Sequence, residues 1–228
     1  MKVIISGGGH GEDTKEQDEL FASLLDKSKP LMYTPIAIDK NKHSYSECLK
    51  WLKSTFENLG VTKYKLFDMG DLEKSKTVNI NDYSGIYIGG GNTPFLLNKL
   101  KQTGFWNLLK KAINEDMPVM GGSAGAIILA KSITPAIYYD MNWIELDDLT
   151  AMNIIKDWEI TCHYTKEEEA KTKKIINENN FEKLVALSDK NGLYVNDKKI
   201  TLIGNESAWI FDKNGNKKEI KIGDQLKD

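Results

Sequence analysis

One serine of the sequence lies in a setting typical of a catalytic nucleophile. Residues 121–125 read Gly-Gly-Ser-Ala-Gly, a G-x-S-x-G motif centred on Ser123, between an apolar segment at 117–120 and a helix-forming segment at 124–130. Small neighbours allow the strained strand-to-helix turn that exposes such a serine, and the following helix would direct N–H groups and partial positive charge toward it. The pattern predicts a nucleophile elbow and a serine hydrolase; the alternative is that Ser123 only caps a helix.

A second glycine-rich turn supports the first. The apolar residues 86–88 are followed by Gly-Gly-Gly-Asn-Thr-Pro at 89–94. Turns that follow parallel strands gather at the carboxyl edge of a sheet, so the N–H of Gly90 or Gly91 could pair with that of Ala124 as an oxyanion hole. A phosphate-binding loop is disfavoured, because the third glycine of the dinucleotide fingerprint and the GxxxxGK[ST] motif are both absent from the sequence.

A serine nucleophile needs a base, and the chain has three histidines. His43 lies in a polar stretch and is expected in a solvated loop. His10 follows the first predicted strand in a glycine-rich turn, and His163 ends the strand-like segment 158–164. Sequence position alone leaves His10 and His163 open as the base.

The residues around His163 also suggest local structure. Thr165 and Glu168 form a capping-box pattern that would start a helix. Cys162 precedes His163 in a strand and should point to the opposite face, so a Cys-His dyad is not predicted. Residues 10–13, His-Gly-Glu-Asp, contain side chains that can bind a metal, but no further ligands follow at useful spacing. We therefore predict no metal site.

Composition limits the possible partners. The chain has 228 residues and a formal net charge of -2, which disfavours nucleic acid as a partner. All 31 positive side chains are lysine, so the protein has no arginine. Two distant cysteines, a short apolar N-terminus and the lack of any membrane-length apolar run predict a reduced cytoplasmic protein that does not engage a membrane.

These side chains require a scaffold, and the sequence pattern describes one. Short apolar runs alternate with amphipathic helical stretches, which predicts a doubly wound, mostly parallel α/β sheet with helices on both faces. The last third changes to brief strands separated by Asn/Asp/Gly turns, which predicts antiparallel hairpins that extend or flank the sheet. We expect a single domain over 1–228, with 133–148 lining the pocket. The predicted strands are 2–6, 31–38, 64–67, 85–88, 118–120, 184–187, 193–195, 200–203 and 208–211, and the predicted helices are 13–25, 44–59, 93–100 and 105–114.

The sequence resembles the S51 serine peptidases typified by dipeptidase E, an aspartyl dipeptidase. The matching pieces occur in the same order: the glycine turn at 89–93, the elbow at 122–126, Asp140 followed by Met141, and His163 followed by Tyr164. The resemblance covers most of the chain, from the first strand to the segment 208–211.

This resemblance implies a fold similar to class I glutamine amidotransferases and hydrolysis of dipeptides with an N-terminal aspartate, without metal or cofactor. It makes Ser123 the nucleophile, His163 the general base, and Gly90 and Ala124 the oxyanion donors. The acidic third member is Asp189, at a strand end, or alternatively Asp140.

The resemblance also leads us to expect substrate contacts from Asn92, Thr93 and Lys171. The family's arginine clamp for the substrate carboxylate has only lysines to replace it, among them Lys171, which predicts weaker or different selectivity for aspartate. Those lysines otherwise form a solvated helix face. We expect a small-peptide substrate and a monomer or homodimer.

Two other functions remain open at this point. A non-catalytic binding or regulatory protein on the same fold would hold its carboxylate too far from His163 to orient the ring. An esterase or amidase of the α/β-hydrolase type would place its acidic residue before the histidine in the chain, as Asp140 is and Asp189 is not.

Overall fold

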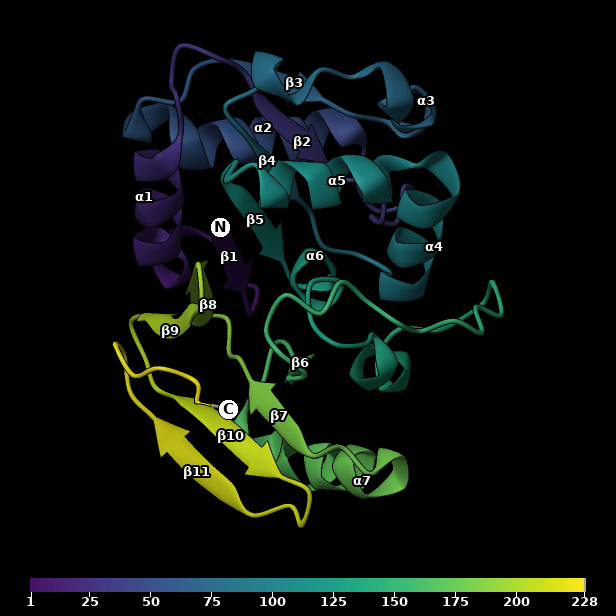
Figure 1. Ribbon diagram of the computed structural model, residues 1–228, viewed down its shortest axis with the longest axis vertical. Coiled ribbons are helices and arrows are strands. Elements are labelled where there is room, and N and C mark those ends of the chain that lie inside the picture. Colours follow the sequence, from purple (N-terminus) through teal and green to yellow (C-terminus); the bar gives the residue numbers. More distant parts are fainter. Residues whose placement is uncertain (228) are drawn as a thin grey trace.

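The centre of the molecule is a seven-stranded sheet in the order β3-β2-β4-β5-β1-β8-β9 (Figure 1). The computed structural model describes residues 1–227. The strands from β3 to β1 are mutually parallel, and β8 and β9 add to β1 as antiparallel neighbours. The predicted doubly wound, mostly parallel sheet is therefore confirmed. Its strands are β1 (Lys2–Ser6), β2 (Leu31–Thr34), β3 (Tyr64–Leu66), β4 (Gly85–Ile88), β5 (Val119–Gly122), β8 (Asn191–Asn196) and β9 (Lys199–Gly204).

Helices cover both faces of this sheet. In β1, the side chain of Ile4 packs with α1 and α2, whereas Val3 and Ile5 pack in the core that also contains α4 and α5. This alternation is the period of two that a strand buried on both faces requires. The helices are α1 (Lys15–Leu24), α2 (Tyr45–Phe56), α3 (Met69–Glu73), α4 (Thr93–Thr103), α5 (Phe105–Asn114), α6 (Ala124–Ile127) and α7 (Glu169–Asn179).

A second sheet of four strands, in the order β11-β10-β7-β6, lies beside the first (Figure 1). Of the predicted antiparallel strands, β8 and β9 extend the central sheet, whereas β7 and β10 pair within the second one. The last strand was not predicted, because three of its four residues are polar and exposed. The strands are β6 (Glu159–Thr161), β7 (Lys183–Ala186), β10 (Ala208–Asp212) and β11 (Lys217–Ile220).

The two sheets share one hydrophobic core. Val3 and Ile5 of the central sheet belong to the same buried cluster as Ile160 and Val185 of the second sheet, and all four side chains are fully buried. Burial of this kind couples the two sheets, and a single domain over 1–228 stays our prediction.

Several element ends differ from the sequence prediction. The predicted strand 31–38 stops at Thr34, because Pro35 cannot donate a backbone hydrogen bond and its carbonyl accepts the N–H of Ile38 in a turn. Within residues 1–227, the connections also contain six 3₁₀ helices. These are η1 (Gly11–Asp13), η2 (Glu57–Leu59), η3 (Ser75–Thr77), η4 (Ile80–Asp82), η5 (Thr134–Tyr138) and η6 (Lys166–Glu168).

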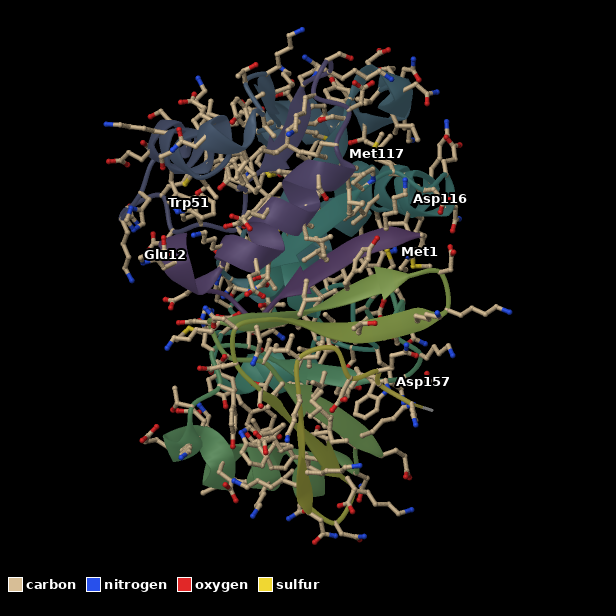
Figure 2. The ribbon with its side chains drawn as sticks, turned by 90° about the vertical axis from the view of Figure 1, so that its left-hand side faces the viewer. Met1, Glu12, Trp51, Asp116, Met117 and Asp157 are labelled. Atoms are coloured by element: carbon tan, nitrogen blue, oxygen red, sulfur yellow. The ribbon has the colours of Figure 1, made fainter. Side chains whose placement is uncertain are left out.

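The N-terminus is held at the edge opposite the strands' carboxyl ends. The ammonium of Met1 donates to carboxylate oxygens of Asp116 and Asp197, and Figure 2 shows Met1 and Asp116 side by side. These carboxylates raise the pKa of the terminal ammonium. The contacts fix the start of β1, whose other end leads to the candidate site.

Candidate active site

Ser123 occupies a sharp turn directly after β5. Its backbone has φ 52° and ψ -114°, a conformation that non-glycine residues rarely adopt. Close backbone approaches maintain the turn: a Cβ on Gly121 would lie 2.2 Å from the carbonyl oxygen of Gly125, and one on Gly125 would lie 2.3 Å from that of Ile88. The G-x-S-x-G residues therefore form the strained elbow that their spacing predicts.

The helix after the elbow is shorter than expected. The predicted helical segment 124–130 contains only the four-residue α6, and the chain then continues in turns, with the N–H of Leu129 donating to Ala126. The helix does begin directly after Ser123, but with one turn it directs less partial positive charge at the serine than the expected longer helix would.

Two backbone N–H groups nevertheless flank Ser123. Ala124 is the first residue of α6, so its N–H has no acceptor within the helix. Gly90 lies against the serine, since a Cβ added to it would be 3.2 Å from Ser123 Cβ. Within residues 1–227, neither N–H donates a hydrogen bond to another group.

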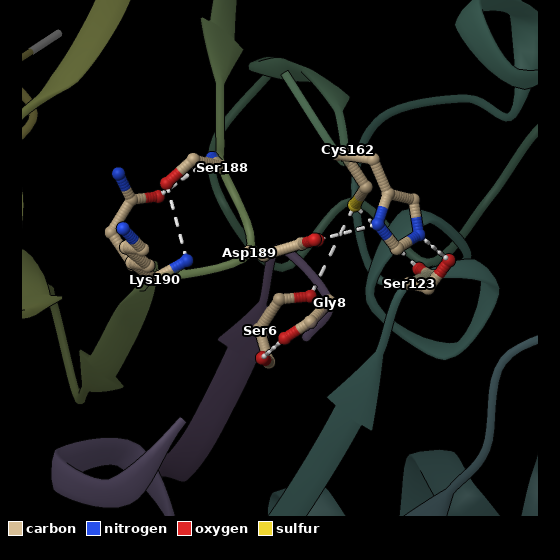
Figure 3. Close-up of polar contacts among 9 residues, drawn as sticks. Ser6, Gly8, Ser123, Cys162, Ser188, Asp189 and Lys190 are labelled. Carbon is tan, nitrogen blue, oxygen red and sulfur yellow. Dashed lines mark hydrogen bonds and ion pairs between the residues drawn. The ribbon is translucent and has the colours of Figure 1, made fainter. Parts of the chain in front are cut away.

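Ser123, His163 and Asp189 form a continuous hydrogen-bonded chain (Figure 3). Ser123 Oγ lies 2.8 Å from His163 Nε2, and His163 Nδ1 lies 2.6 Å from Asp189 Oδ1. An ionised carboxylate can only accept, so Nδ1 carries the proton and Nε2 is free to accept the serine hydroxyl. About half of each of the His163 and Asp189 side chains is exposed, at 54% and 49%, so a substrate can reach them.

Backbone contacts with the end of β1 position His163. The residue has a left-handed φ of 56°, and its N–H donates to the carbonyl of Gly7 at 3.1 Å. Gly8 has φ 132°, and a Cβ there would lie 2.2 Å from His163 Cε1. Sequence reasoning missed the role of Gly8; the glycine run after the first predicted strand was the signal that could have revealed it.

The turn after β7 positions Asp189. The N–H of Ser188 donates to Asn191 Oδ1 at 3.0 Å, and the N–H of Lys190 donates to Ser188 Oγ at 3.2 Å (Figure 3). Asn191 is fully buried and donates to the carbonyl of Ser207 at 3.0 Å. These bonds fix the turn against the second sheet, unlike an ordinary solvated hairpin.

The alternative acid, Asp140, lies elsewhere in the site. Its Oδ2 accepts the N–H of Thr93 at 3.0 Å and the Thr93 hydroxyl at 2.5 Å, at the N-terminus of α4. No hydrogen bond or ion pair joins it to His163 within residues 1–227. The carboxylate that contacts His163 thus follows it in the chain, which is not the order of an α/β-hydrolase, and it lies close enough to orient the ring.

The other candidate side chains take no part in this chain of hydrogen bonds. His10 lines a separate hollow of about 390 Å³ beside Trp51, and His43 is exposed in a loop. Cys162 Sγ lies 3.8 Å from the carbonyl oxygen of Ser123. Burial, with help from nearby carboxylates, raises the pKa of this thiol, so Cys162 remains protonated.

Ser123 and His163 open into a cavity of about 890 Å³. Four residues of the segment 133–148 line it, which confirms the prediction for that segment; they are Ala136, Tyr139, Asp140 and Trp143. Asn92 also lines the cavity, although its Oδ1 accepts the N–H of Phe95 and its Nδ2 donates to Met141.

The other two predicted substrate contacts are placed differently. Thr93 is fully buried and its hydroxyl donates to Asp140. Lys171 does not line the cavity; its Nζ lies 3.5 Å from the centre of the Tyr139 ring. The neighbouring lysines of α7 form ion pairs along the helix, Lys173 with Glu169 and Lys174 with Glu178. This helix presents no clamp for a substrate carboxylate to the cavity.

Two structural features are absent from residues 1–227. No cluster of three or more histidine, cysteine, aspartate or glutamate side chains is arranged to hold a metal ion. No helix combines the length and the apolar character needed to cross a bilayer.

Comparisons with known proteins agree with the fold. The family model described as Peptidase family S51 matches residues 3–203. Peptidase E of Shewanella amazonensis is 26% identical over 191 residues, which cover 80% of this chain and 78% of that protein.

Two solved structures are similar in fold. A protein of Listeria monocytogenes EGD-e described as a peptidase E has a TM-score of 0.70 at 22% identity, covering 90% of this chain and 98% of that one. A peptidase from an acI-B1 Actinobacterium has a TM-score of 0.68 at 17% identity, covering 99% and 96%.

Proposed function

Because the chain belongs to peptidase family S51, we propose that it is a serine peptidase that cleaves dipeptides or similarly short peptides through an acyl-enzyme on Ser123. The observation that carries this proposal is the hydrogen-bonded chain from Ser123 Oγ through His163 to Asp189, with distances of 2.8 and 2.6 Å. A serine hydroxyl, an imidazole with a free nitrogen and an orienting carboxylate are the components of nucleophilic acyl transfer.

The first half of the reaction forms the acyl-enzyme. Ser123 Oγ attacks the carbonyl carbon of the scissile peptide bond while His163 Nε2 accepts the hydroxyl proton. The N–H groups of Gly90 and Ala124 donate to the resulting oxyanion. His163 then passes its proton to the leaving amine as the C–N bond breaks, which leaves the acyl group on Ser123.

The second half regenerates the enzyme. A water molecule attacks the ester carbon, His163 accepts one of its protons, and the same proton returns to Ser123 Oγ when the carboxylic acid departs. Asp189 remains ionised throughout and stabilises the imidazolium that forms in each half.

The size of the cavity favours short substrates. Its volume of about 890 Å³ lies within the range of about 300–1,000 Å³ that is usual for small-molecule sites. The family resemblance also leads us to expect an N-terminal aspartate, but the chain has no arginine and the lysines of α7 do not line the cavity. We therefore do not extend the proposal to aspartate selectivity.

A fluorophosphonate probe tests the nucleophile. We expect labelling of the wild-type protein and none of Ser123→Ala, together with hydrolysis of members of a dipeptide library by the wild type only. Equal labelling of both proteins would overturn the role of Ser123. A folded wild type without labelling or hydrolysis would instead indicate a binding protein, and cleavage of esters alone would indicate an esterase.

A further inference from the structure

The charged side chains of the cavity are unevenly distributed. The two lysines that line it, Lys40 and Lys42, are exposed and already contact other side chains. Lys40 Nζ lies 4.5 Å from the centre of the Tyr45 ring, and Lys42 forms an ion pair with Asp39 at 3.9 Å. The half-buried charged residues of the lining are carboxylates, Asp140 and Glu168. The inner wall therefore offers negative charge.

These two carboxylates differ in what balances them. Asp140 accepts two hydrogen bonds from Thr93 at the N-terminus of the eleven-residue helix α4, where the helix dipole favours a negative charge. Within residues 1–227, the Glu168 side chain has a single hydrogen bond, from the Tyr139 hydroxyl to its Oε2 at 2.9 Å. The Lys171 ammonium lies 3.5 Å from the centre of the same Tyr139 ring but forms no ion pair with Glu168. In the same part of the chain, Glu168 Oε1 has no hydrogen-bonding partner and no lysine within 4.0 Å.

Glu168 also departs from the local role that the sequence predicts for it. The capping box with Thr165 does not form, since neither side chain accepts a hydrogen bond from the helix that follows. Glu168 precedes the first residue of α7 but turns instead toward Tyr139 and the cavity. Burial and the Glu168 carboxylate raise the pKa of Tyr139 to about 12, so its hydroxyl remains a donor.

The rest of the inner wall is apolar. Ile127, Ala136 and Ile160 line it together with Ser123, and Phe95 stacks on Trp143 with ring centres 5.4 Å apart. An uncharged side chain would bury apolar surface here, whereas a carboxylate side chain would lose water and face Asp140 and Glu168.

We propose that Glu168, held by Tyr139, binds the free α-ammonium group of the substrate, and that the apolar wall accepts the side chain of the same residue. The preferred substrates are then short peptides with a free N-terminus and an apolar first residue, and an N-terminal aspartate is disfavoured. This proposal rests on the proposed peptidase function, because it assigns the substrate of that same site.

Three dipeptide substrates separate these features: Leu-Leu, N-acetyl-Leu-Leu and Asp-Leu. We expect the wild type to favour Leu-Leu by roughly tenfold or more in kcat/KM over each of the others, because opposite charges attract and like charges repel in a partly desolvated site. Glu168→Gln should lose most of this preference, chiefly through a higher KM for Leu-Leu. Its kcat/KM for N-acetyl-Leu-Leu should remain at the wild-type value.

Two further variants complete the test. Glu167→Gln removes the same charge from the exposed neighbouring residue, which does not line the cavity, and should behave as wild type. Tyr139→Phe removes only the hydroxyl that holds Glu168, and should raise KM for Leu-Leu by a smaller factor than Glu168→Gln. If Glu168→Gln does not fold, Tyr139→Phe decides the question.

Several outcomes would overturn the proposal. A wild type that prefers Asp-Leu would exclude an ammonium site at Glu168. So would a Glu168→Gln protein whose kcat/KM falls by the same factor for Leu-Leu and for N-acetyl-Leu-Leu. Fluorophosphonate labelling keeps this separate from the proposed function: normal labelling of Glu168→Gln shows intact serine chemistry, whereas an unlabelled wild type counts against the peptidase mechanism itself.

Discussion

The contact between His163 Nδ1 and Asp189 Oδ1, 2.6 Å long, determines which imidazole nitrogen holds the proton. Asp189→Asn would present an amide in place of the carboxylate and favour the wrong tautomer. We expect kcat to fall by roughly 10³-fold or more, as is usual for removal of a triad carboxylate, with little change in thermal stability. Steady-state kinetics beside a thermal melt checks this.

Asp140→Asn is the matched control, because both carboxylates were candidates for the third member. Its contacts are with Thr93, so the expected effect is a stability loss of about 0.5–1 kcal/mol from a weaker charge at the start of α4. The pH profile of kcat should be unchanged. A loss of kcat as large as that of Asp189→Asn would contradict the assignment.

Gly8 controls the position of the imidazole ring. In Gly8→Ala, the new Cβ would meet His163 Cε1 at 2.2 Å, so we expect the ring to move and kcat to fall by about 10²-fold. Gly11→Ala provides the control, since Gly11 also has a positive φ, 62°. Apart from its two chain neighbours, no atom of residues 1–227 lies within 4 Å of its Cβ position. Equal activity of both variants would show that the ring tolerates the methyl group.

Residues fixed by local sequence could be predicted, and residues fixed by distant contacts could not. The elbow at Ser123 follows from small neighbours within two positions. The choice between Asp140 and Asp189 depends on the turn after β7, which Asn191 fixes through a contact with Ser207. The capping box at Glu168 failed for the same reason, because the hydroxyl of Tyr139, 29 positions away, donates a hydrogen bond to the Glu168 carboxylate.

Strand β6 begins with a buried carboxylic acid. Glu159 is 3% exposed, and its Oε2 accepts the N–H and the hydroxyl of Ser132 at 3.2 and 2.9 Å. Burial raises the pKa of Glu159 from 4.5 to about 7. The folded state therefore binds a proton that the unfolded chain releases, and this contribution to stability is lost as the pH rises from about 4.5 through 7.

Glu159→Gln should remove this dependence, because the amide stays neutral. We expect the variant to gain stability relative to wild type between pH 5 and 8, by on the order of 3 kcal/mol at most. Urea unfolding at several pH values measures it. Glu219→Gln on β11, an exposed residue, serves as the control and should follow wild type. If the difference in unfolding free energy between wild type and Glu159→Gln is the same at all pH values, protonation of Glu159 does not affect stability.

Elements with a strong apolar pattern were predicted well. α5 has the predicted bounds, 105–114, because six of its residues are buried on one face. β11 was missed because only Ile220 of its four residues is buried, and pairing with β10 defines it. α6 ended early although its composition favours a longer helix, since propensity is weaker than tertiary packing.

Across the whole molecule, the site joins the two sheets. Ser123 follows β5 of the central sheet, whereas His163 and Asp189 follow β6 and β7 of the second sheet. Leu187 lies fully buried in the shared core, and its carbonyl accepts the N–H of Tyr164. Alignment of the three side chains thus depends on how the sheets pack.

We expect one cooperative unfolding transition for both sheets, because they share this core. Tryptophan fluorescence and residual activity should lose signal at the same urea concentration. Leu187→Ala should lower both midpoints together, with a destabilisation of about 2–5 kcal/mol. Two separate midpoints would show that the sheets are independent domains.

The division of the site between the sheets also orders events during synthesis of the protein. Ribosomes release the N-terminal segment first, so Ser123 emerges before His163 and Asp189. β7 gains its antiparallel neighbour only from residues 208–212. A chain that stops earlier holds Ser123 without a fixed His163 and Asp189. The hydrogen-bonded chain from Ser123 through His163 to Asp189 is therefore completed last, when the second sheet closes.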